Sequence, residues 1–120
     1  MILDTSKNKE FKPLEKKAIK GLLAKHGLDI GVNVIRNEGL KWRENVACFS
    51  VMHPDTVFVC ADQPNICRLI PHIAHKLKHR EQYKRMGKVR YLMLMNPLWR
   101  KWTLEPECYA EEDRLNLEMQ

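Results

Sequence analysis

A chain of 120 residues and 14.2 kDa is long enough for one compact domain and too short for two ordinary ones, so residues 1–120 are expected to form a single domain. Its 44% hydrophobic and 30% charged residues are typical of a soluble globular protein, and no apolar run approaches the ~20 residues of a membrane-spanning helix. The net charge of +6 permits attraction to nucleic acid or another acidic surface.

The first eleven residues predict a cytoplasmic protein with no membrane partner. Only Ile2 and Leu3 are apolar before the segment turns polar, which excludes the apolar core of a secretory signal. Without such a signal, and with no CxxC pair, the four cysteines are predicted to be free thiols; they are Cys48, Cys60, Cys67 and Cys108.

The first half of the chain predicts one helix followed by strands. Apolar residues recur at helical spacing over residues 13–26, and Gly27 is expected to end that helix. Residues 28–34 alternate between apolar and polar types, as in a half-buried strand. The β-prone runs 46–52 and 56–60 flank a turn with Pro54 and Asp55, which predicts an antiparallel hairpin.

The second half predicts three helices. The first starts after Asp62 and Pro64 and continues to Gly87; Pro71 predicts either a kink or a new helix start inside it. The others cover residues 89–96 and 106–117. The expected fold class is therefore α+β, with a small antiparallel sheet and its hairpin packed on helices.

Two histidines four residues apart, His75 and His79, lie on the first of these three helices. Four residues make about one helical turn, so both imidazoles project from one face and can bind one zinc ion together with a third ligand. Glu107 and Glu105, at the start of the final helix, are the natural sources of that ligand. Two histidines and one carboxylate would leave a fourth position open to water.

These features resemble the small zinc metallopeptidases that carry a gluzincin-like HExxH motif. The resemblance covers about the last half of the chain, through Ala74 to Met86, Asn96-Pro97-Leu98 and Glu105 to Ala110. It implies a minimal zincin-like fold, a zinc cofactor, and a peptide or protein substrate bound along the last hairpin strand, Val57 to Cys60. It also implies His75 and His79 as ligands with an acid from the final helix, for which Glu107 is favoured and Glu105 and Glu111 are alternatives.

Lys76 departs from this pattern. It occupies the motif position at which the family has a glutamate, the general base that takes the proton from the attacking water. A protonated lysine has no lone pair to accept that proton. Losing a positioned base typically costs about 10² to 10⁴ in rate. The sequence therefore predicts a metallopeptidase-like protein that is inactive or impaired.

Two other functions remain open. The scaffold could be a basic module that binds nucleic acid or an acidic protein, or a pseudoenzyme that binds peptides without cutting them. The first would use Lys78, Lys84, Arg85, Lys88 and Arg90. Trp99 and Trp102 flank Arg100 and Lys101 and are expected to cap a small core rather than contact bases or lipid.

Overall fold

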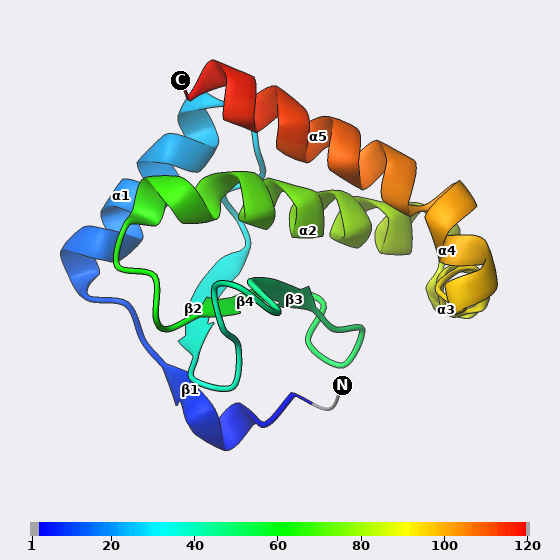
Figure 1. Cartoon of the computed structure of the whole chain (residues 1–120), viewed down its shortest axis with the longest axis horizontal. Coiled ribbons are helices and arrows are strands. Elements are labelled where there is room, and N and C mark those ends of the chain that lie inside the picture. Colours follow the sequence, from blue (N-terminus) through cyan, green and yellow to red (C-terminus); the bar gives the residue numbers. More distant parts are fainter. Residues whose placement is uncertain (1–2, 120) are drawn as a thin grey trace.

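The computed structural model describes residues 3–119, which form one small sheet and five α-helices (Figure 1). A short 3-10 helix precedes the sheet, and the sheet's second and third strands are separated by a loop. In chain order the elements are η1 (Thr5–Lys7), β1 (Asn8–Lys9), α1 (Pro13–Lys25), β2 (Asn33–Asn37), β3 (Ala47–Phe49), β4 (Thr56–Cys60), α2 (Ile66–Met86), α3 (Lys88–Leu94), α4 (Pro97–Thr103) and α5 (Glu105–Glu118).

The sheet is mixed, which corrects the expectation of an antiparallel one. Its strand order is β1-β2-β4-β3. The hairpin of β3 and β4 is antiparallel as predicted, and β1 is antiparallel to β2. The hairpin docks on β2 through its second strand, however, and β2 and β4 run parallel. The α+β class is confirmed, with β4 in the centre of the sheet.

The second strand begins later than the alternating pattern suggested. The Asp29 carboxylate accepts a hydrogen bond of 2.8 Å from the Gly31 amide. This local turn competes with strand geometry, so pairing starts only at Asn33, opposite Thr56. The expected strand over residues 28–34 is therefore displaced toward the C-terminus.

The long helix α2 is continuous, which excludes a separate helix starting at Pro71. Its first turn is capped by the Asn65 side chain, which accepts a hydrogen bond from the Cys67 amide. It ends at Gly87, whose φ of 86° is a conformation that glycine adopts readily. Helix α3 matches the predicted helix 89–96 closely, and α5 matches 106–117. Helix α4 was not expected.

Two stripes of buried residues on α2 organise the molecule. The apolar stripe packs toward the sheet and α1; its fully buried members are Leu69, Ile70, Ile73 and Ala74. The second stripe is polar and follows at spacings of four and three residues: His75, His79 and Gln82. Helix α5 lies side by side with α2, on the side away from the sheet (Figure 1). Within residues 3–119, none of the helices has the length and apolar character to cross a membrane.

Candidate metal centre

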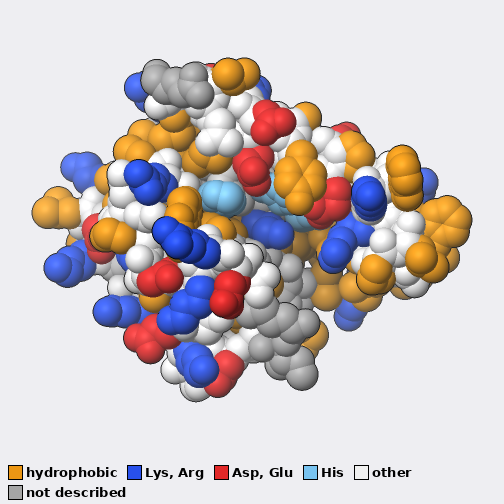
Figure 2. Space-filling view, viewed as in Figure 1, with side chains coloured by type: hydrophobic (Ala, Val, Ile, Leu, Met, Phe, Trp, Pro, Cys, Tyr) orange, Lys and Arg blue, Asp and Glu red, His pale blue; other side chains and the backbone are white. Residues whose placement is uncertain are grey.

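Histidine side chains lie in a hollow between the sheet and the last helices, flanked by acidic and basic groups (Figure 2). The hollow is a cavity of about 460 Å³. Helix α2 lines it with His72, His75, Lys76 and His79, and the junction of α4 and α5 contributes Arg100 and Glu105. Both histidines of the polar stripe therefore face a space that a ligand can enter.

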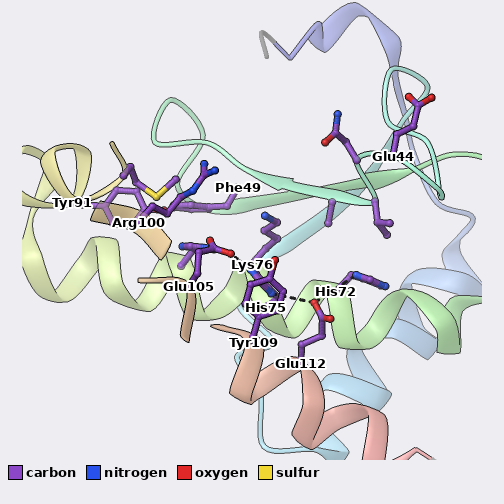
Figure 3. A pocket seen from close by; sticks show the side chains of 15 residues that line it. Glu44, Phe49, His72, His75, Lys76, Tyr91, Arg100, Glu105, Tyr109 and Glu112 are labelled. Carbon is purple, nitrogen blue, oxygen red and sulfur yellow. Dashed lines mark hydrogen bonds and ion pairs between the residues drawn. The ribbon is translucent and has the colours of Figure 1, made fainter. Parts of the chain in front are cut away.

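Both predicted histidine ligands meet the carboxylate of Glu105. The His79 Nε2 atom lies 2.7 Å from one oxygen of Glu105, and the His75 Nε2 atom lies 3.4 Å from the other. Glu105 and His75 lie close together at the cavity wall (Figure 3), and His79 lines the same cavity. The two rings have only 5% and 2% residue exposure, so little water competes for these nitrogens.

Glu112 holds the opposite side of the His75 ring. Its carboxylate lies 3.1 Å from His75 Nδ1, so the two ring nitrogens face two different acids. Histidine ligands of metals commonly donate their second N–H to a carboxylate in this way, which fixes the ring and leaves the other nitrogen for the metal. His72 lies 3.7 Å from the same Glu112 oxygen and packs edge-on against Trp42.

Both histidines are neutral at neutral pH. Burial, followed by the positive charge of Lys76, lowers the pKa of His75 to about 4. The same two causes, in the same order, lower the pKa of His79 to about 4. A neutral imidazole keeps a lone pair available for a metal ion. A neutral ring carries only one N–H, so His75 can donate a hydrogen bond to only one of the two acids beside it, Glu112 or Glu105.

Glu107, the favoured third ligand, does not reach the histidines. Its carboxylate accepts a hydrogen bond of 2.8 Å from Gln82 Nε2 and lies 3.5 Å from Arg85. Gln82 also donates to the Leu104 carbonyl at 3.0 Å. Gln82 therefore anchors the start of α5, and the acid brought to the histidines is Glu105, the first residue of that helix. Glu111, the other alternative, pairs with Arg114.

Cys108 is a potential ligand that the sequence analysis missed. Single ligand atoms of His75, His79 and Cys108 lie within 4.8 Å of one another, and all three residues are buried. Burial raises the pKa of Cys108 to about 12, so its sulfur is a thiol unless a metal displaces the proton. The sequence does contain a signal for this ligand, because Glu105 and Cys108 are three residues apart on one helix and therefore share a face.

Lys76 extends from α2 into the cavity, away from the His75 ring (Figure 3). Within residues 3–119, no carboxylate lies close enough to form an ion pair with it. Its charge is the second cause of the low pKa of both histidines. The cavity therefore holds a cation at the position where the resemblance implies a base.

The edge strand beside the cavity is β3, not β4. Val57 to Cys60, expected to offer a free edge to substrate, form the central strand and are paired on both sides. Ala47 and Phe49 of β3 line the cavity instead. The Cys60 amide donates to the Val46 carbonyl, so antiparallel alternation turns the backbone groups of Ala47 and Phe49 away from β4.

The donor set suits a zinc ion in its chemistry. Two neutral imidazoles, a carboxylate and a nearby thiol are the ligand types that zinc takes in proteins. One feature differs from typical metal sites: His79 Nδ1 is buried without a hydrogen-bond partner, whereas metal-binding histidines usually have one. No protein-family model, curated protein or solved structure matches this chain.

Proposed function

We propose that this protein is a zinc-binding, metallopeptidase-like protein whose centre consists of His75, His79 and Glu105. The observation that carries the proposal is the convergence of both Nε2 atoms on one carboxylate, at 2.7 and 3.4 Å, inside a cavity. Glu112 supports it by holding His75 from the other side. The zincin-like fold and the peptidase kinship rest on the resemblance in the second half of the sequence.

The peptide-binding part of the proposal rests on β3. An edge strand with outward backbone groups can add an extended peptide as a further strand. Ala47 and Phe49 bring such an edge to the wall of the histidine cavity. A peptide or protein segment is therefore the proposed ligand, lying along β3 with one carbonyl near the histidines.

The chemistry proposed for this site is weak or absent hydrolysis. A bound zinc ion would supply a Lewis acid that polarises a carbonyl or a water molecule. The protein then has no group at this position to accept the proton of the attacking water, because Lys76 is an ammonium without a lone pair and points away from the His75 ring. The protein is accordingly a pseudoenzyme or a strongly impaired peptidase that retains peptide binding.

The basic-module alternative has less support. Two of its five expected contact residues are engaged in ion pairs: Lys78 with Glu81, and Arg85 with Glu81 and Glu107. Such surface ion pairs neutralise the positive charge with which Lys78 and Arg85 would contact a phosphate backbone.

Elemental analysis of protein prepared with zinc tests the proposal directly. We expect about one zinc per chain in the wild type, following a single three-ligand site. Zinc should be lost in the double variant His75→Ala, His79→Ala and strongly weakened in Glu105→Ala. Glu111→Ala is the matched control, because it removes a carboxylate of the same helix that pairs with Arg114 and should leave zinc content unchanged. Zinc retained by the double histidine variant, or absent from the wild type, would refute the site.

The same measurement identifies the third ligand. If the carboxylate completes the site, Cys108→Ser retains zinc while Glu105→Ala does not. The reverse result would assign the third position to the thiol. A cobalt-loaded sample distinguishes the two as well, because thiolate ligation adds an intense near-ultraviolet charge-transfer band that carboxylate ligation lacks.

A further inference from the structure

Helices α3 and α4 form a lobe at one end of the molecule that exposes an unusual amount of apolar surface. We call residues 88–103 the α3–α4 lobe. Six large apolar side chains on it are exposed: Val89 (74%), Leu92 (46%), Met93 (67%), Leu98 (77%), Trp99 (59%) and Trp102 (76%). Apolar side chains gather at this end in the space-filling view, next to basic ones (Figure 2). The expectation that the two tryptophans cap a small core is therefore wrong.

The apolar side chains follow helical spacing, so each helix presents a stripe rather than scattered residues. Val89 lies three and four positions from Leu92 and Met93 on α3, and Leu98 lies four positions from Trp102 on α4. Single exposed apolar residues are normal on a protein surface, but a group of six on two short consecutive helices is not. Such a patch marks a surface that contacts something else.

The charge of the same segment is entirely positive. Residues 82–104 contain six basic residues and no acidic one. Four of the six lie on the lobe and are exposed: Lys88, Arg90, Arg100 and Lys101. Lys101 Nζ lies 5.7 Å from the centroid of the Trp102 ring, so a cation and an indole ring lie next to each other on the surface. The partner of this lobe must therefore be both anionic and apolar.

We propose that the α3–α4 lobe binds the surface of an anionic lipid bilayer. A bilayer interface takes indole rings at headgroup depth and aliphatic side chains just below, while anionic lipid headgroups attract the basic residues nearby. Nucleic acid would use the tryptophans and the cations but leave four aliphatic side chains in water. A second copy of the lobe would cover the apolar residues but oppose like charges. The proposal is independent of the metal centre, because none of the six exposed apolar side chains lines the histidine cavity.

Vesicle sedimentation at low salt tests this binding mode. We expect the wild type to sediment with phosphatidylcholine vesicles that contain phosphatidylglycerol, and much less with phosphatidylcholine alone. The variant Trp99→Ala, Trp102→Ala should bind about tenfold or more weakly. The control Leu14→Ala, Met52→Ala removes two apolar side chains elsewhere that are at least as exposed, at 82% and 77%, and should bind as the wild type does. Circular dichroism checks that all variants are folded.

Two charge-reversal variants distinguish a specific role of the lobe from a general effect of the protein's net charge. Arg90→Glu, Lys101→Glu should abolish sedimentation, whereas Lys17→Glu, Lys20→Glu on α1 changes the net charge equally and should preserve it. No binding to anionic vesicles at low salt would overturn the proposal, as would equal binding of the lobe variant and the control. Two other results would overturn the proposal and assign the lobe to another partner. One is a dimer in light scattering and the other is RNA binding without vesicle binding, in each case lost only in the tryptophan variant.

Discussion

His75 Nδ1 and the Glu112 carboxylate lie 3.1 Å apart, on the side of the ring opposite Glu105. This contact joins the middle of α2 to the middle of α5, whereas Glu105 joins α2 to the start of α5. One histidine thus has its two nitrogens fixed by two acids of the same helix. The orientation of His75 toward the proposed metal position depends on this arrangement.

Replacing Glu112 by glutamine should weaken metal binding without removing a ligand. The amide keeps the size of the side chain but loses the negative charge that orients His75. Residues that hydrogen-bond to a metal ligand typically contribute about 10- to 100-fold to metal affinity. Competition with a coloured zinc chelator measures the loss. Glu111→Gln is the control, because Glu111 is also part-buried but pairs with Arg114; equal losses in both variants would count against a specific role for Glu112.

The stability of the metal-free protein should fall as pH drops from about 6.5 toward 4. The pKa of His75 and of His79 is about 4 in the folded protein, below the ordinary value of 6.5. Between these values the unfolded chain takes up protons that the folded one does not. Each histidine then removes up to about 1.4 kcal/mol per pH unit, and the full stability is present only above pH ~6.5.

Urea unfolding at a series of pH values measures this dependence. The decline should be shallower in His75→Gln, His79→Gln, since glutamine does not titrate. A wild-type free energy of unfolding that stays constant between pH 6.5 and 4.5 would show that the two rings are not held neutral by burial.

The helices were predictable because their signals are local. The apolar period of α2, its start after Pro64 and its end at Gly87 are all visible in the sequence. Helix α4 could have been found as well, because Asn96 accepts a hydrogen bond from the Leu98 amide and Pro97 occupies the first helical position. The order of strands could not be obtained in this way, since alternation does not say which strand of a hairpin pairs with β2. The continuous apolar run Val57 to Cys60 does indicate a central strand.

At the candidate site, the histidine pair was predictable and the acid was not. The four-residue spacing of His75 and His79 determines that they share a face. Choosing between Glu105 and Glu107 requires the rotation of α5 about its axis, because residues two apart on a helix point in widely different directions. That rotation is set by the contacts of Gln82 with Leu104 and Glu107, which join segments 22 and 25 residues apart. Only the fold brings them together.

Replacing Lys76 by glutamate should introduce hydrolytic activity in the zinc-loaded protein. The new carboxylate would stand one residue from His75 and could accept a proton, which the ammonium cannot do. A positioned general base contributes about 10² to 10⁴ in rate. Cleavage of a fluorogenic peptide library measures the gain, and chelation of the metal should abolish it.

Lys78→Glu is the matched control for that gain. It makes the same charge change two residues further along α2, where Lys78 pairs with Glu81. Removing the positive charge beside the rings should also raise the pKa of both histidines in Lys76→Glu, as a histidine titration by NMR would show. Equal activity in both glutamate variants, or none in either while zinc is bound, would contradict the assignment of residue 76 to the base position.

Gln82→Leu should destabilise the protein and disturb the metal centre together. Gln82 is fully buried and joins α2 to the start of α5 through Leu104 and Glu107. Leucine of similar size would leave the Leu104 carbonyl without its donor, at a cost of about 1–3 kcal/mol in the free energy of unfolding. Arg85→Ala removes the other contact of Glu107, but Arg85 is half exposed, so that loss should stay below about 1 kcal/mol. Because Leu104 directly precedes Glu105, zinc affinity should fall in Gln82→Leu and persist in Arg85→Ala. Urea unfolding and chelator competition on both variants measure the two effects, and a stable Gln82→Leu with normal zinc affinity would mean that another contact sets the position of Glu105.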